Sequence, residues 1–130
     1  MKLQPAGFLK RVEALCRKYD VHLILDEVCV GCKRPGSIFV REQEGVVPDF
    51  LRLAKGLTGG YLPPAATLTT EKMYRAFLGS FDTGNAFYHG HTFTGNPLAA
   101  SAAFKSLEKL ERLIGSKRLE ARKAARLFFH

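Results

Sequence analysis

The stretch FLRLAKGLTGGYLPPAATLTT, residues 50–70, contains the features that decide the fold. Four of its first five residues are apolar and predict a short β-strand that ends directly before Lys55. The glycines and prolines at 56–64 then predict a tight connection, because these residues interrupt regular structure. A further strand is predicted at 65–69. An amine is therefore expected at the carboxyl end of a strand, beside a glycine-rich turn.

The segment before this stretch predicts a helix and another strand. Residues 7–19 have charged side chains between apolar ones at helical spacing, which predicts an amphipathic helix with one buried stripe. Residues 21–25 (VHLIL) are short, β-rich and almost entirely apolar, as expected of a strand buried on both faces of a parallel sheet. Asp26 and Glu27 follow it. The loop after them leads into a weakly helical or irregular segment at 37–45.

The segment after the stretch predicts two helices separated by a long loop. Thr70 is a suitable N-cap for a helix at 71–78. Residues 79–95 contain four glycines and predict a loop of a length that is often functional. Asn96 followed by proline predicts the start of a second helix, which Gly115 ends, and 117–129 is a further helical segment.

This order of elements predicts an α/β fold, a mostly parallel sheet with flanking helices. The 130 residues have room for one domain of ordinary size. No apolar run approaches the roughly 20 residues of a membrane-spanning helix, and the N-terminus lacks the apolar stretch of a secretory signal. We therefore expect a cytoplasmic protein that does not associate with membranes.

The net charge of +8 raises the question of nucleic-acid binding. Much of it lies at 105–130, where eight basic and three acidic residues follow a helical period. A charged helix face of this kind is usually solvated. Because no aromatic residues are interleaved with the basic ones and no known motif is present, we expect no nucleic-acid partner.

Three cysteines raise the question of a metal or redox site. Cys29 and Cys32 have the spacing of a zinc or redox pair, and His89 and His91 are possible partners. A structural zinc site needs about four ligands, however, and no second cysteine pair exists to supply them. We therefore predict no metal and interpret Cys16, Cys29 and Cys32 as thiols in a reducing compartment.

Asp26 and Lys55 each follow a predicted strand. Ligands of parallel α/β sheets bind beyond the carboxyl ends of the strands, so the two side chains could share a site there. The alternative is that they are solvated strand ends or an ion pair. Gly56, Gly59 and Gly60 favour the site, since residues without side chains allow a flat ligand to approach the backbone beside the amine.

Three strings support this interpretation: LILDEV at 23–28, residues 50–70, and HGHTFTGNPLAA at 89–100. They resemble the class III (ω-amino) aminotransferases of fold type I, which use pyridoxal 5′-phosphate. The resemblance covers about 7–113 and implies that 1–115 is part of the large cofactor-binding domain, with 116–130 a truncated helical tail. Upstream and C-terminal parts of the family pattern have no counterpart, so the chain resembles an internal fragment that we expect to be inactive alone.

The resemblance implies roles for single residues. Lys55 matches the lysine that holds the cofactor as a Schiff base and moves the substrate proton. Asp26 matches the aspartate that pairs with the pyridine nitrogen, and Val28 matches the aliphatic residue on the ring face. A carboxylate in that place keeps the nitrogen protonated, so that the ring acts as an electron sink.

The resemblance also implies a homodimer. Thr92 matches a threonine that reaches the cofactor phosphate of the partner subunit. Gly90 and His91 line the same wall, with Gly90 facing the substrate and His91 the cofactor. Thr58 is either a further hydroxyl near the phosphate or a turn-capping residue. His89 and His91 are either bases or parts of the loop structure.

The implied reaction is amino transfer from an amine donor to a keto acceptor. Within the family, the resemblance is to the biotin-synthesis branch, in which S-adenosylmethionine is the donor. Alternatives are another ω-aminotransferase that acts on ornithine, diamines or γ-aminobutyrate, or a non-catalytic remnant. The segment 29–36 (CVGCKRPG) departs from the family pattern, because Lys33 and Pro35 stand where small or flexible residues are usual.

Overall fold

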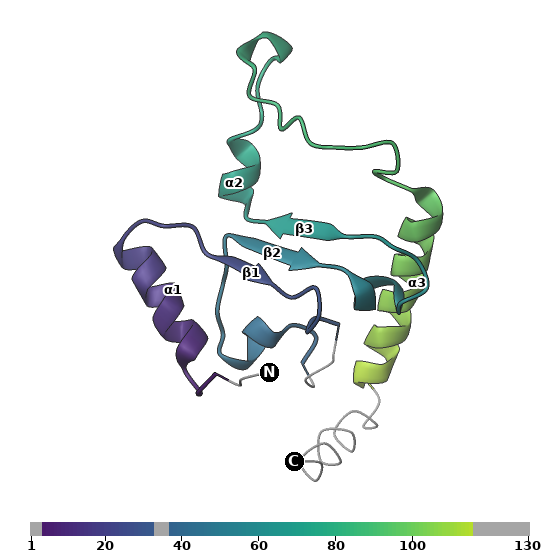
Figure 1. The fold of residues 1–130 in the computed structure, drawn as a ribbon, viewed down its shortest axis with the longest axis horizontal. Coiled ribbons are helices and arrows are strands. Elements are labelled where there is room, and N and C mark those ends of the chain that lie inside the picture. Colours follow the sequence, from purple (N-terminus) through teal and green to yellow (C-terminus); the bar gives the residue numbers. More distant parts are fainter. Residues whose placement is uncertain (1–3, 33–36, 116–130) are drawn as a thin grey trace.

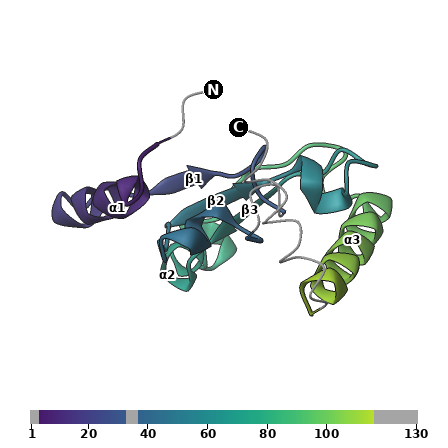
Figure 2. The same ribbon diagram turned by 90° about the horizontal axis from the view of Figure 1, so that it is seen from below.

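A three-stranded sheet with helices at its two ends forms the body of the molecule (Figure 1). The computed structural model describes residues 4–32 and 37–115. The elements in chain order are α1 (Phe8–Lys18), β1 (Ile24–Asp26), β2 (Phe50–Leu53), β3 (Ala66–Thr69), α2 (Glu71–Arg75) and α3 (Pro97–Gly115), with 3₁₀ turns η1 (Val40–Gln43), η2 (Lys55–Thr58) and η3 (Phe81–Thr83). Helices α1 and α3 lie at opposite ends of the sheet, as Figure 2 shows from below.

The strand order is β1-β2-β3, and the two pairings differ in direction. Strands β1 and β2 are parallel, whereas β2 and β3 are antiparallel. The connection from β2 to β3 contains only η2 and turns, and a parallel return normally needs a longer crossover, usually through an α-helix. The predicted α/β class is confirmed, and the described part of the sheet is mixed rather than mostly parallel.

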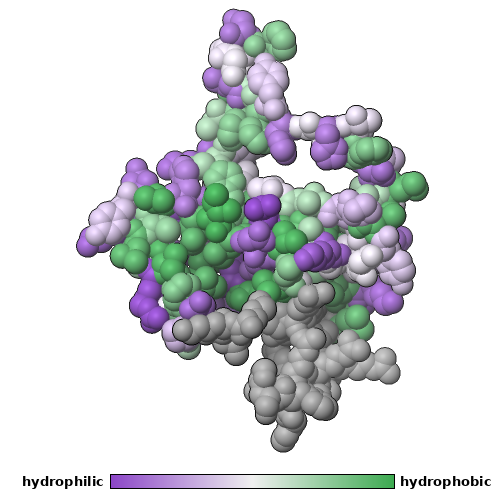
Figure 3. Space-filling model, viewed as in Figure 1, coloured by the Kyte–Doolittle hydropathy of each residue, from purple (hydrophilic) through white to green (hydrophobic). Residues whose placement is uncertain are grey.

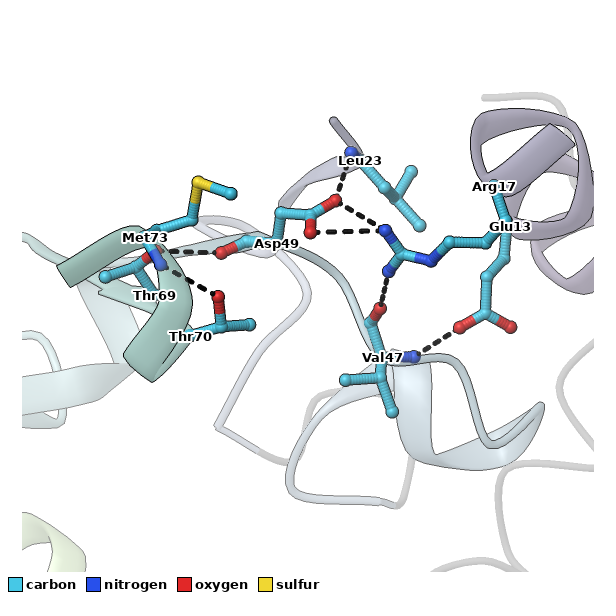
Figure 4. Close-up of polar contacts among 8 residues, drawn as sticks. All are labelled: Glu13, Arg17, Leu23, Val47, Asp49, Thr69, Thr70 and Met73. Carbon is cyan, nitrogen blue, oxygen red and sulfur yellow. Dashed lines mark hydrogen bonds and ion pairs between the residues drawn. The ribbon is translucent and has the colours of Figure 1, made fainter. Parts of the chain in front are cut away.

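Asp49, directly before β2, ties α1 to the sheet (Figure 4). Its carboxylate accepts the backbone N–H of Leu23 at 2.8 Å and forms an ion pair with Arg17 of α1 at 2.9 Å. Arg17 also donates to the carbonyl oxygen of Val47, and Glu13 accepts the Val47 N–H. The helix predicted at 7–19 is therefore confirmed at Phe8–Lys18, but its predicted buried stripe is wrong for the described chain, because none of its residues is buried and Leu15 is 54% exposed.

The strand predicted at 21–25 is shorter and more exposed than expected. It begins at Ile24, whose side chain is 58% exposed, and only Leu23 just before it is buried. Within the described residues β1 pairs with β2 alone, so one edge and one face are uncovered. On the other face Leu51 and Leu53 of β2 are buried, and with Leu23, Val46 and Ala99 they are the buried apolar residues of the described chain. Burial on both faces was wrong for this chain, because no described layer covers the second face.

In the second half of the chain the predicted helix starts are confirmed, whereas the first of the two helices is shorter than predicted. The Thr70 hydroxyl accepts the Met73 N–H and caps α2. The helix ends at Arg75, earlier than predicted, because the N–H groups of residues 76–78 donate to the carbonyl oxygens three residues earlier, as in a 3₁₀ turn, and not four residues earlier as in an α-helix. Residues 79–95 form the predicted long loop, which projects from the body (Figure 1). Asn96 caps α3 as predicted, accepting the N–H groups of Leu98 and Ala99.

Two predicted features fall outside the described residues. These are the helical tail at 116–130 and the part of the departing loop that holds Lys33 and Pro35. In the part that is described, no helix is long and apolar enough to cross a membrane.

Candidate functional site

Asp26 and Lys55 lie at the same edge of the parallel strand pair. Asp26 ends β1 and is in register with Arg52 of β2, and Lys55 follows β2 three residues after Arg52. Because parallel strands present their carboxyl ends at the same end of a sheet, the fold places a carboxylate and an amine at the same end of this strand pair. This confirms the predicted placement of both residues, while their chemical roles remain predictions.

The Lys55 amine extends toward the loop that follows β1. Lys55 has a positive φ of 46° and begins the turn η2, and its side chain is exposed. A non-glycine residue in this backbone region is uncommon and often marks a functional site. The amine donates a hydrogen bond to Cys29 Sγ. The amine is thus held at the strand edge by a weak acceptor and remains open to a ligand.

The Asp26 carboxylate has two partners from the chain. One oxygen accepts the N–H of Val28 at 3.0 Å, and the other lies 3.4 Å from the guanidinium of Arg52. The side chains of Asp26 and Arg52 are 55% and 57% exposed. The Val28 side chain is half-buried. The carboxylate is therefore oriented but accessible, as a group that is to receive a further donor must be.

Glu27, next to Asp26, has a structural role that the sequence did not indicate. It is 3% exposed, and its carboxylate accepts the backbone N–H groups of Val40 at 2.8 Å and Arg41 at 2.9 Å. These are donors at the start of η1 that have no partner within the turn. Of these two adjacent acids, Asp26 is thus exposed and Glu27 is buried.

Of the three glycines near Lys55, Gly56 is required by the packing of the chain, whereas Gly59 and Gly60 are not. A Cβ on Gly56 would lie 2.7 Å from the Cβ of Cys32, so Gly56 is needed for the 27–32 loop to pass. Gly59 would meet Ser106 and Tyr61 at ordinary contact distance, and only Gly60 faces open space. The prediction that all three glycines clear space for a flat ligand is therefore wrong for Gly56.

Thr58 closes the turn after Lys55. It is 1% exposed, and its hydroxyl donates to the Leu62 carbonyl oxygen at 2.7 Å and accepts the Leu62 N–H at 3.3 Å. Of the two interpretations left open, the turn-capping role is the one that these contacts support. Thr58 fixes the shape of the loop that starts at Lys55.

Gly90, His91 and Thr92 lie on the long loop and are all exposed. The His91 N–H donates to the Thr94 hydroxyl at 2.8 Å, and the His91 ring nitrogen Nδ1 accepts the Phe93 N–H at 3.1 Å. These contacts support the interpretation of His91 as loop structure. Thr92 has an exposed side chain, as a residue that reaches another molecule requires.

An open groove of about 720 Å³ lies between this loop, the β2–β3 connection and the first turns of α3. The opening is visible in Figure 3 beside the projecting loop. His91 lines it together with His89, Phe87 and Phe93, whereas Asp26 and Lys55 do not. The structure therefore does not gather the six predicted site residues around one cavity. It places Asp26, Val28 and Lys55 at the strand edge and the 90–92 segment elsewhere.

All three cysteines are free, and Cys32 is distinguished by its environment. Burial, and then the nearby Glu27 carboxylate, raise the pKa of the Cys32 thiol, which keeps it protonated and weakens it as a nucleophile. In the described ranges 4–32 and 37–115, no three His, Cys, Asp or Glu side chains are grouped so as to hold a metal ion.

The strand-edge groups fit the donor and acceptor pattern of pyridoxal phosphate. Covalent attachment needs an accessible amine, and Lys55 is exposed. A protonated ring nitrogen needs a carboxylate with a free lone pair, and each oxygen of Asp26 has one protein partner and room for another. The described residues near the ends of β1 and β2 supply these two groups. The fit therefore concerns the aldehyde of the cofactor, which the amine would hold, and its ring nitrogen, which the carboxylate would face.

Comparison with known proteins gives a consistent result. The family Aminotransferase class-III matches residues 1–127. The chain is 58% identical over 107 residues to the adenosylmethionine-8-amino-7-oxononanoate aminotransferase of Aquifex aeolicus, a match that covers 82% of this chain and 24% of that protein. A crystal structure of the enzyme of that name from Methanocaldococcus jannaschii is 49% identical, covers 83% of this chain and 26% of the other, and has a TM-score of 0.80.

A more distant structure carries information on the cofactor. The ornithine aminotransferase of Toxoplasma gondii, with PLP at partial occupancy in its active site, is 35% identical, covers 82% of this chain and 23% of its own, and has a TM-score of 0.70. The chain thus spans about a quarter of the length of each of these relatives.

Proposed function

This chain belongs to the class-III aminotransferase family, and we propose that a complete protein containing it transfers amino groups with pyridoxal 5′-phosphate. The observation that carries the proposal is that the carboxyl ends of β1 and β2 lie side by side. There, an accessible carboxylate on Asp26 and an accessible amine on Lys55 follow paired parallel strands. The bound cofactor supplies an electron sink for carbanion chemistry at the substrate carbon.

Lys55 has two tasks in this proposal. Its amine would be the group that holds the cofactor, and the same amine would move the proton at the substrate α-carbon. Both tasks need an accessible amine in a fixed position. The exposed side chain of Lys55, and the turn η2 that begins at this residue, support them. Thr58 and Leu62 keep that turn in shape.

Asp26 and Val28 orient the ring. The Asp26 carboxylate keeps the pyridine nitrogen protonated, and the Val28 side chain packs against the ring face. The turn hydrogen bond from the Val28 N–H to Asp26 supports a joint role, because it fixes the two residues relative to each other. Replacing Asp26 with alanine is expected to leave the cofactor bound but to lower kcat by several orders of magnitude, as loss of pre-organised charge does elsewhere.

We assign the donor S-adenosylmethionine and the acceptor 8-amino-7-oxononanoate, a step of biotin synthesis. Five relatives that are 50–58% identical to this chain carry that enzyme name, and these percentages support the assignment. The second candidate is an ornithine aminotransferase, which the T. gondii structure at 35% identity supports less strongly.

The proposal includes a homodimer in the cytoplasm. Thr92 reaches the cofactor phosphate of the partner subunit, with Gly90 and His91 beside it on the substrate and cofactor sides. The exposure of all three side chains, and the absence of Lys55 and Asp26 from the groove that His91 lines, support a role in another subunit's site. Three free thiols support a reducing compartment.

The test uses a complete enzyme. In a chimera, the 107-residue part of this chain that matches the A. aeolicus relative replaces the corresponding segment of that protein. We expect turnover with S-adenosylmethionine and 8-amino-7-oxononanoate and little with ornithine. Lys55→Ala is expected to abolish turnover, whereas Lys72→Ala, which removes an exposed lysine of α2, retains it. Full turnover of the Lys55→Ala chimera, or a preference for ornithine, would contradict the proposal.

A further inference from the structure

Arg52 and Asp26 face each other across the parallel pair of strands. They are Cα partners in the register of β1 and β2, and paired residues present their side chains on the same face of a sheet. The guanidinium nitrogen Nη1 of Arg52 lies 3.4 Å from Oδ2 of Asp26. Within residues 4–32 and 37–115, Asp26 is the one carboxylate that forms an ion pair with Arg52.

The ion pair has no evident purpose in folding. Both side chains are more than half exposed, and exposed ion pairs contribute little to stability. Leu51 and Leu53, on either side of Arg52, already bury their side chains on the opposite face of β2. Arg52 is therefore free to act on the carboxylate it touches without being needed for the core.

The other cation at this edge is engaged elsewhere. The Lys55 amine donates to Cys29, whereas Arg52 reaches Asp26. A guanidinium is charged at every physiological pH and keeps its planar donor geometry. The Asp26 carboxylate thus has a permanent positive neighbour on Oδ2 and a backbone donor from Val28 on Oδ1.

We propose that Arg52 is a positioning residue that fixes the Asp26 carboxylate and moderates its charge toward the pyridine nitrogen of the cofactor. The inference rests on the proposed function of Asp26 and Lys55. A positive charge beside the Asp26 carboxylate partly offsets its negative charge. It therefore reduces the electrostatic stabilisation that the carboxylate would give to a protonated ring nitrogen. Arg52 thereby sets how strongly the ring withdraws electrons while touching neither substrate nor cofactor.

The test reads the ring nitrogen directly. The chimera is loaded with pyridoxal phosphate labelled with ¹⁵N in the ring, and its ¹⁵N chemical shift is recorded at one pH near neutrality. We expect Arg52→Thr, which suits an exposed strand position, to move the signal toward that of a protonated pyridinium. Arg52→Lys is expected to restore a signal close to that of the parent chimera, because it keeps a cation beside Asp26.

Two controls separate this effect from a general change in charge. Arg75→Gln removes an exposed arginine of α2 that pairs with Glu71, and it is expected to leave the ¹⁵N signal unchanged. Since Arg52 acts through Asp26, Arg52→Thr is also expected to have no effect when Asp26→Asn is already present. A shift of equal size in that background would contradict a role through the carboxylate.

The outcomes also distinguish this inference from the proposed function. Borohydride reduction followed by peptide mass spectrometry shows whether the cofactor is attached to Lys55. Attachment at Lys55 with the same ¹⁵N signal in the parent chimera and in the Arg52→Thr chimera overturns the role of Arg52 alone. Absence of attachment at Lys55 overturns the proposed function, and the inference with it.

Discussion

At the residue scale, Asp49 is the residue whose single substitution is expected to affect stability most, because its buried carboxylate joins α1 to the sheet. The backbone N–H of Leu23, and after it the Arg17 side chain, lower the pKa of Asp49 against the opposing effect of burial. Asp49→Asn in the chimera is expected to reduce the free energy of unfolding by about 1–3 kcal/mol, because a buried donor loses its charged acceptor. Urea unfolding measures this as a lower midpoint at unchanged slope.

The lowered pKa of Asp49 also predicts that the stability of the fold depends on pH. Because its pKa is lowered in the folded state, its contribution is fully present above the pKa of an unfolded aspartate, about 3.9, and is lost as the pH falls through the lower folded value. The difference between parent and Asp49→Asn should therefore shrink in acid. Glu71→Gln, which breaks the exposed Arg75 ion pair, is the matched control and should change stability by less than about 0.5 kcal/mol. An equal loss in both variants would contradict the special role of Asp49.

The residue-level predictions succeeded where the signal was local. A charged residue directly after an apolar run indicates a strand end, so the positions of Asp26 and Lys55 at the ends of β1 and β2 could be predicted from the sequence, while their chemical roles stay predictions. Glu27 and Arg52 were missed, because their roles depend on partners 13 to 26 residues away whose positions only the fold decides. The glycine at 56 was misinterpreted for the same reason, since the Cys32 side chain it accommodates comes from another loop.

At the element scale, the start of α3 gives a direct test of the fold. The Asn96 side chain accepts two of the N–H groups that have no partner in the first turn. Asn96→Ala in the chimera is expected to cost about 0.5–2 kcal/mol, measured as a lower midpoint of thermal or urea unfolding. Asn96→Asp keeps an acceptor and should stay near the parent. Equal destabilisation by both variants would show that the cap is not what stabilises this helix.

Helix starts could be predicted because capping residues act on their immediate neighbours, as Thr70 and Asn96 show. Strand burial could not. The apolar run at 21–25 predicts cover on both faces, yet Ile24 of β1 is 58% exposed because no described layer packs there. The antiparallel direction of β3 could not be predicted from the apolar pattern either, because it depends on how the short connection from β2 reverses the chain.

At the scale of the whole molecule, the chain shows more apolar surface than one small domain usually does. Phe81, Phe87 and Phe93 of the long loop are 92%, 66% and 74% exposed, and Leu98 of α3 is 72% exposed. We expect the 130-residue chain alone to self-associate and to show no transamination. Size-exclusion chromatography and an assay with S-adenosylmethionine and 8-amino-7-oxononanoate test this. A monodisperse, active chain would contradict it.

The central claim is that Lys55 holds the cofactor, and trapping tests it most directly. The chimera is incubated with pyridoxal phosphate, reduced with borohydride, digested and analysed by mass spectrometry. We predict a pyridoxyl label on the peptide that contains Lys55, absent after Lys55→Ala and retained after Lys72→Ala. A label that stays in the Lys55→Ala chimera on a different lysine of this chain would contradict the account.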